Sequence, residues 1–153
     1  MKRKKFFRKG AAVLEMSIIL SAFLTLTMGI LDLGIGVFRY NILSEAARFT
    51  ARRAIVHGSK ATTLGTWGPT TINSAVSATG IPAIDGDTDG VKRKLITCDP
   101  AQTNLTITWP DGNSDVGSRV KVTITTPYKP LFSFILPGGQ MTLTARTTMY
   151  IAH

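Results

Sequence analysis

Residues 11–38 read AAVLEMSIILSAFLTLTMGILDLGIGVF, a long and almost uncharged apolar stretch. Its charged residues are Glu15 and Asp32, which enclose an uncharged run from Met16 to Leu31. As a helix the stretch would rise about 42 Å, more than the roughly 30 Å of a bilayer's hydrocarbon core. It is also longer than the about 7–15 apolar residues of a cleaved secretory signal, so residues 11–38 are predicted to form a transmembrane helix. The alternative is a buried helix of a soluble bundle that carries a basic tail.

The preceding residues 1–10 (MKRKKFFRKG) form a basic leader with six Lys and Arg residues and no acid. The 153-residue chain has a net charge of +9, but residues 11–153 hold twelve basic and nine acidic residues and contribute only +3. Such an excess usually suggests nucleic acid, yet most of it adjoins the apolar helix, so no nucleic-acid partner is expected. The positive-inside rule predicts a single-pass protein of the cytoplasmic (inner) membrane, with a cytoplasmic N-terminus and a periplasmic or extracellular domain after Phe38.

Glu15 is the unusual residue of the span, because a carboxylate at the centre of a bilayer costs roughly 2.5–3.5 kcal/mol and somewhat less near its surface. It stands five residues after Gly10, which closes the leader. This order of basic leader, Gly and apolar helix with Glu at its fifth position resembles type IV pilin-like precursors. In those precursors a membrane aspartyl peptidase cuts after the Gly, and the new amino group can pair with the Glu of a neighbour. The resemblance implies cleavage between Gly10 and Ala11; the alternative is an unprocessed chain whose Glu15 snorkels to the interface.

The helix is predicted to continue outside the membrane over residues 39–57, which contain no Pro or Gly and many good helix formers. Polar and apolar residues recur with the helical period, so they would form a polar stripe on one side of the helix and an apolar face on the other. The polar stripe contains Asn41, Glu45, Arg48 and Arg52, and the opposite face contains Ile42, Leu43, Ala46, Ala47, Thr50 and Ala54. The small residues predict close packing, either on the chain's own domain or on neighbouring subunits.

The whole segment resembles the TadE-like family, minor pseudopilins of the tight-adherence (Flp) pilus system. The matching residues are Gly10-Ala11-Ala12 with Glu15, Gly29-Ile30-Leu31-Asp32-Leu33-Gly34, Ala46-Ala47-Arg48 and Ala51-Arg52. The resemblance implies that a prepilin peptidase and other pilus-assembly proteins are partners, and that Gly29, Asp32, Gly34, Ala46, Ala47, Arg48, Ala51 and Arg52 serve helix packing. Two positions depart from the family: Asp32 replaces the usual Glu, and Met16 stands where cleaved members have an aromatic residue. The order of residues 120–149 also resembles the C-terminal end of TadE-like proteins.

Residues 58–153 are expected to form an exterior α+β domain. Alternation of apolar and polar residues predicts three antiparallel strands, Thr103–Trp109, Ser118–Thr126 and Gln140–Ile151, with one face covered by the helix of residues 40–57. A short helix is predicted at Thr71–Thr79. The apolar segment Leu131–Leu136 is expected to be buried under the sheet, with docking to the membrane or a partner as the alternative.

The sequence contains no arrangement typical of catalysis, zinc or phosphate binding. Asp85, Asp87 and Asp89 match the start of a calcium loop, but its twelfth position is Ile96 instead of a bidentate Glu. We therefore expect no metal and no cofactor, and treat the three Asp residues as a weak calcium candidate. The single cysteine, Cys98, is expected to be an ordinary thiol; the alternative is a disulfide between two subunits.

These observations predict a non-enzymatic, membrane-anchored pseudopilin that takes part in Tad/Flp pilus assembly or tight-adherence secretion. Lateral packing of the helix and contacts of the exterior domain would supply the mechanism, without a small-molecule substrate. The alternative is a single-pass, membrane-tethered binding domain, calcium-dependent or not, that is unrelated to pili. A secreted enzyme is disfavoured because no nucleophile, base or metal set is recognisable.

Overall fold

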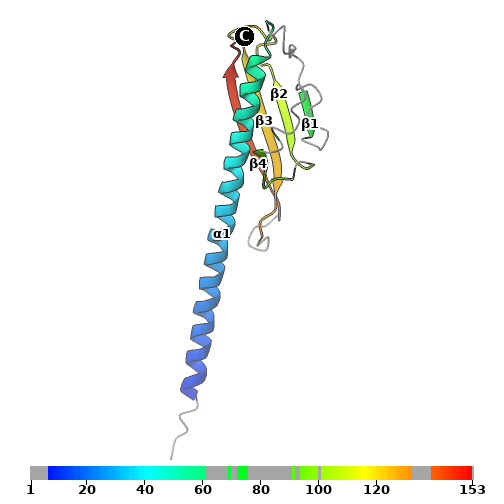
Figure 1. The fold of residues 1–153 in the computed structure, drawn as a ribbon. Helices are drawn as coiled ribbons and strands as arrows, with labels where there is room; N and C mark the ends of the chain where they lie inside the picture. Colours follow the sequence, from blue (N-terminus) through cyan, green and yellow to red (C-terminus); the bar gives the residue numbers. More distant parts are fainter. Residues whose placement is uncertain are drawn as a thin grey trace, which may run out of the picture.

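The main elements of the described residues are one long helix and a small antiparallel sheet, as the sequence predicts for an α+β fold (Figure 1). The computed structural model describes residues 7–60, 69, 72–75, 91, 94–99, 101–131 and 139–152, with backbone alone for 7–9 and 72–75. The helix projects far beyond the sheet at its N-terminal end, while its C-terminal end lies beside the sheet (Figure 1).

Helix α1 spans Phe7–Val56 without interruption, so the predicted membrane helix and its continuation form one rod. Its N-terminal half contains several hydroxyl residues, and these donate hydrogen bonds to backbone carbonyls of the preceding turn. Examples are the bonds from Ser17 Oγ to Val13 O and from Thr25 Oγ1 to Ser21 O, both 2.8 Å long. Because the helix itself satisfies these hydroxyls, they do not oppose an apolar environment.

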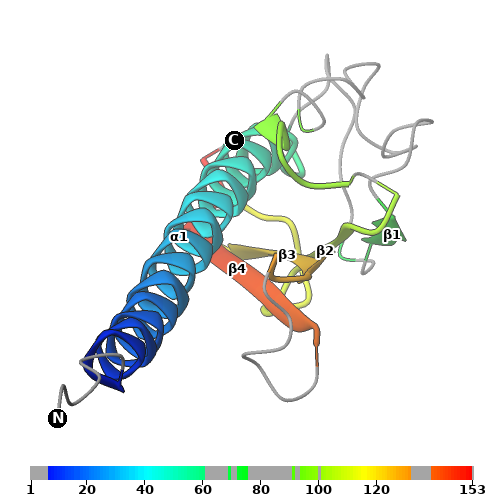
Figure 2. The same ribbon diagram turned by 90° about the horizontal axis from the view of Figure 1, so that it is seen from below.

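The sheet has the order β1-β2-β3-β4, and every neighbouring pair is antiparallel. Strands β2 (Asn104–Thr108), β3 (Arg119–Tyr128) and β4 (Met141–Tyr150) correspond to the three predicted strands. Every second residue of β3 is buried, which confirms the predicted alternation. Viewed from below, α1 lies next to β4, and β1 is the strand farthest from it (Figure 2).

The helix predicted at Thr71–Thr79 is wrong, because Ile72–Ala75 forms strand β1 at the edge of the sheet. Ile72 pairs with Ile107, and Ala75 pairs with Asn104. A segment this short has little intrinsic helical stability. The free edge of β2 offers it a ladder of backbone hydrogen bonds, and this tertiary contact overrides the weak helical pattern.

The core lies between the C-terminal half of α1 and one face of the sheet. Most of the predicted apolar face of α1 is buried: Leu43, Ala46 and Ala47 have no exposed surface, Thr50 and Ala54 have almost none, and Ile42 is partly buried. Ala51 is buried with them. The sheet contributes Leu105, Ile107, Val120, Val122, Ile124 and Ala145. Since most of the helix residues in this interface are alanines, the helix backbone lies close to the strands. The alternative that this face packs chiefly on neighbouring subunits is therefore excluded.

Candidate functional site

The end of strand β3 is attached to the middle of α1 through Asp32. The hydroxyl of Tyr128 donates a hydrogen bond to the backbone carbonyl of Asp32, at 3.1 Å. The backbone N–H of Leu131 donates to Asp32 Oδ1, at 2.9 Å. Asp32 therefore accepts hydrogen bonds from both sides of the residue pair Lys129-Pro130, at the point where the chain leaves the sheet.

The ring of Tyr128 lies along α1 between Asp32 and Arg39, which are two helical turns apart. The Arg39 guanidinium carbon is 5.1 Å from the ring centroid, a cation–π distance. A Cβ placed on Gly36 would be 3.6 Å from Tyr128 Cε1, so the ring lies directly against the helix backbone. Burial of the ring, together with the negative charge of Asp32, raises the pKa of Tyr128, while Arg39 opposes the shift. The phenol therefore stays protonated at neutral pH and acts as a donor.

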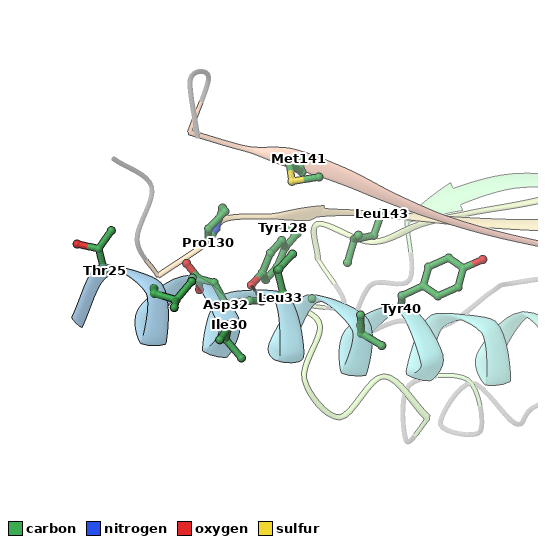
Figure 3. A pocket seen from close by; sticks show the side chains of 13 residues that line it. Thr25, Ile30, Asp32, Leu33, Tyr40, Tyr128, Pro130, Met141 and Leu143 are labelled. Carbon is green, nitrogen blue, oxygen red and sulfur yellow. Dashed lines mark hydrogen bonds between the residues drawn. The ribbon is translucent and has the colours of Figure 1, made fainter. Parts of the chain in front are cut away.

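An apolar groove of about 730 Å³ opens beside this attachment, between α1 and the ends of β3 and β4 (Figure 3). We call it the tip groove. Its lining on the sheet side is Tyr128, Pro130, Met141 and Leu143, and its lining on the helix side is Thr25, Leu26, Gly29, Ile30, Asp32, Leu33, Gly36, Val37 and Tyr40. Thr25 turns its hydroxyl back to the helix, so its methyl group adds to the apolar lining.

On the N-terminal side of the sheet, residues 10–31 of α1 have an almost entirely apolar and largely exposed surface. We call this part the bare half of α1. Leu14, Ile18, Phe23 and Leu26 are among its exposed side chains. Its most apolar 18-residue window has a mean hydropathy of 2.1, and no residue of that window is buried. Helix α1 is thus long and apolar enough to cross a membrane, by length and composition.

The residues predicted for leader processing lie on this bare part. Gly10, Ala11 and Glu15 are all exposed, and the Gly10–Ala11 bond lies inside the helix, which begins at Phe7. A Cβ placed on Gly10 would meet nothing within 4 Å. In the described chain, then, no other segment covers the bond that the pilin-like order marks for cleavage.

The residues predicted for helix packing divide into three groups. Gly29 and Asp32 line the tip groove. Ala46, Ala47 and Ala51 are buried in the chain's own core. The third group, Gly34, Arg48 and Arg52, is exposed on other faces of α1.

Arg48 and Arg52 line a polar depression with Glu45 and Lys94 on the side of α1 that faces away from the sheet. Lys94 Nζ donates to Glu45 Oε1 at 2.8 Å, and this bond lowers the pKa of Glu45. Both side chains are largely solvent-exposed, so the pair contributes little to stability.

Sequence reasoning did not identify Tyr128, Arg39 or Gly36 as members of a site. Tyr128 is the last residue of an alternating strand, and its position in the pattern indicates burial without naming its partner. Asp32 is the residue from which the sequence indicates a site here, because a carboxylate next to an apolar run usually has a partner. Its partners are Tyr128 and Leu131, about a hundred residues away in the chain.

The weak calcium candidate, Asp85, Asp87 and Asp89, lies outside the described residues. Among the residues that are described, no three His, Cys, Asp or Glu side chains are grouped so as to hold a metal ion. Cys98 is a buried thiol, and burial raises its pKa, opposed by the charge of Arg39. This position favours the ordinary core thiol over a disulfide between subunits.

No curated protein and no solved structure matches the chain. A family model does match, over the stretch that includes the processing residues, the Asp32 attachment and most of the helix that packs on the sheet. The match ends before the sheet, so the resemblance of residues 120–149 stays a prediction. The family suggests a function related to the Tad pilus. Residues 10–52 match the model of TadE-like protein, as the sequence predicted.

Proposed function

We propose that the protein is a minor pseudopilin that is anchored in the cytoplasmic membrane by α1 and takes part in assembly of the Tad/Flp pilus or in the associated secretion. Its N-terminus is cytoplasmic, and its sheet domain lies on the periplasmic or extracellular side. We propose no enzymatic activity, because the TadE-like family whose model matches residues 10–52 is not known for one.

A single observation carries this proposal: the two halves of α1 have opposite environments. The C-terminal half is buried against the sheet along its alanine face. The N-terminal half leaves bulky apolar side chains exposed all around, including Val13, Ile19 and Phe23. A helix that is apolar on every face is stable in lipid or among other apolar helices, and not in water.

The bare half of α1 provides the surface for lateral packing in an assembly. After cleavage at Gly10, Glu15 is the charged side chain between Ala11 and Leu31. In an apolar surrounding, a carboxylate needs a positively charged partner. The amino group created at Ala11 of a neighbouring subunit is positively charged and would lie near the same cytoplasmic end of the membrane as Glu15, so we propose it as that partner.

Intact-mass measurement of the full chain, extracted from membranes after co-expression with its prepilin peptidase, tests the processing step. We expect a chain that begins at Ala11, and a full-length chain when Gly10 is replaced by Val. A Gly34→Ala variant, altered at an exposed glycine farther along α1, is the matched control and should be processed normally. A full-length wild-type chain in the presence of active peptidase would contradict processing.

Deletion of the gene in its host, followed by isolation of surface fibres, tests the pilus role. We expect loss or a marked reduction of fibres, restored by the wild-type gene. Normal fibres in the deletion strain would favour the alternative, a membrane-tethered binding domain unrelated to pili.

A further inference from the structure

The length of the bare helix sets the depth at which the sheet domain begins. The 21 residues from Ala11 to Leu31 rise about 32 Å, close to the roughly 30 Å of the hydrocarbon core. In the full, unprocessed chain, the basic residues just before Gly10 hold the cytoplasmic end of the helix at the headgroups. The next residue after this length is Asp32, where Tyr128 and Leu131 attach the sheet to the helix. In the membrane orientation proposed above, this length places the Asp32 attachment at the outer surface of the bilayer.

The end of the sheet at this depth carries the kinds of residues that are common in segments that bind the membrane interface. We call the residues Lys129–Leu131 and Met141 the domain tip. Leu131 is 71% exposed and Met141 is 46% exposed, although both are apolar. The predicted burial of the segment 131–136 is therefore wrong for Leu131, and its other residues lie outside the described part of the chain. Lys129 is also exposed and is the charged residue of the tip. Apolar side chains with a neighbouring Lys are typical of segments that insert shallowly among anionic lipids.

The tip groove is continuous with the bare surface of α1. Leu26, Ile30 and Leu33 line it and are at the same time among the most exposed residues of the helix. Lipid chains that surround the helix below Asp32 therefore reach the groove without crossing a polar barrier. In water the same groove would leave the sides of Met141 and Leu143 and the helix residues uncovered, which the hydrophobic effect disfavours.

From this continuity we propose that the domain tip is seated in the outer lipid interface of the membrane. Leu131 and Met141 insert among the lipids, Lys129 lies at the phosphate groups, and an acyl chain of an outer-leaflet lipid fills the tip groove. The inference rests on the membrane-anchored orientation proposed above. Its consequence is that the end of the sheet nearest the membrane is held both by Asp32 and by the bilayer.

Site-specific fluorescence in vesicles tests the seating. In a Cys98→Ala background, single cysteines replace Leu131, Met141, Val116 or Ile18, each is labelled with bimane, and the full chain is reconstituted in phosphatidylethanolamine–phosphatidylglycerol vesicles. Val116 is the matched control, since it is apolar and 50% exposed but lies in the β2–β3 turn, at the end of the sheet away from the tip. Ile18 lies in the bare half of α1 and reports the span itself.

We expect lipids with a doxyl group near the headgroup end of the chain to quench the probes at 131 and 141 strongly and the probe at 116 hardly at all. The probe at 18 should be quenched more by lipids with a deep doxyl group. Probes at 131 and 141 that behave like the one at 116, while the probe at 18 is quenched, would overturn the seating and leave the anchor intact. An unquenched probe at 18 would instead overturn the anchor.

Occupation of the groove by a second copy is the competing outcome. It would give disulfide cross-links between chains that carry Leu33→Cys, combined with loss of quenching at Met141, and would overturn the proposal. Because Leu131 and Met141 are exposed, their substitution should preserve folding, and thermal unfolding in detergent checks this for each variant. If Cys98→Ala unfolds the domain, the native chain serves as background, since its buried thiol labels slowly.

Discussion

The hydroxyl of Tyr128 donates a hydrogen bond to the backbone carbonyl of Asp32 across 96 positions of the chain. That carbonyl lies inside a continuous helix, where it also accepts the helical hydrogen bond, so the Tyr128 hydroxyl donates to the second lone pair of the carbonyl oxygen. This bond, the Leu131 N–H bond to the Asp32 carboxylate and the cation–π contact with Arg39 hold the end of the sheet on the helix. These contacts fix the end of the sheet beside the bare half of α1, while the buried core fixes the rest of the sheet on the helix.

Replacement of Tyr128 by Phe removes the hydroxyl and keeps the ring against Gly36 and Arg39. We expect the free energy of unfolding of the detergent-solubilised chain to fall by about 1 kcal/mol, the usual net value of one hydrogen bond. The measurement is thermal or denaturant unfolding. Tyr150→Phe is the matched control, because Tyr150 is exposed, and it should leave stability unchanged. Equal stability of both variants would mean that the Tyr128 hydroxyl does not hold the domain.

Asp32→Ala removes the carboxylate that accepts from the Leu131 N–H. We expect a loss of about 1–2 kcal/mol, since a charged acceptor is lost, and a smaller loss for Asp32→Asn, which keeps one oxygen. Asp32→Glu tests the family pattern and should retain the acceptor. Protease cleavage near residue 131 should increase in the Ala variant, because the chain leaving β3 is no longer held. Unchanged cleavage and stability would argue against the attachment.

Ala47 has no exposed surface and lies where α1 meets the sheet. Ala47→Leu adds a large side chain to a packed interface and should destabilise the chain by about 1–3 kcal/mol. Arg48→Leu, the same new side chain one position along on the exposed face, is the control and should change unfolding by less than about 0.5 kcal/mol. A tolerated Ala47→Leu would show that helix and sheet are less closely packed than the structure indicates.

Asp111 forms hydrogen bonds with Arg119 Nε, with Arg119 Nη2 and with the Arg119 backbone N–H. These bonds lower the pKa of Asp111 from 3.8 to about 2. Because the folded state holds the carboxylate ionised, its stabilising contribution is complete above the unfolded pKa and is lost as the pH falls toward about 2.

Asp111→Asn should therefore lower the melting temperature at neutral pH, and the difference from wild type should vanish near pH 2. Melting temperatures measured across this acid range check the prediction. Asp115→Asn, in the same turn, is the control. If the difference in melting temperature between Asp111→Asn and wild type stayed constant down to the lowest pH, the effect of the substitution would not come from the loss of the Asp111–Arg119 pair.

Glu15→Gln removes the charge from the bare half of α1 and preserves its size. We expect cleavage after Gly10 to continue, while association between differently tagged copies in membranes falls about tenfold, which corresponds to about 1.4 kcal/mol. Ser17→Ala is the control, because the Ser17 hydroxyl is bonded within its own helix. Association that is insensitive to Glu15→Gln would exclude its pairing with the neighbour's amino group.

Elements with strong local patterns were predictable from the sequence. The apolar run of residues 11–38, the alanine face beyond it and the alternation of β3 each reflect a period that the backbone itself imposes. Strand β1 was mistaken for a helix because four residues carry too little pattern, and the edge of β2 determines their conformation.

Composition and periodicity were enough to predict a membrane-length helix, three strands and most of the residues that face the core. That Asp32 receives Tyr128 and Leu131, and that a groove opens between Met141 and the helix, follows only from how the sheet packs on the helix. Two segments separated by nearly a hundred residues meet only through the register and twist of the sheet on the helix. Hydrophobic periodicity specifies which face is buried, but it contains no information about which atom a buried hydroxyl will reach.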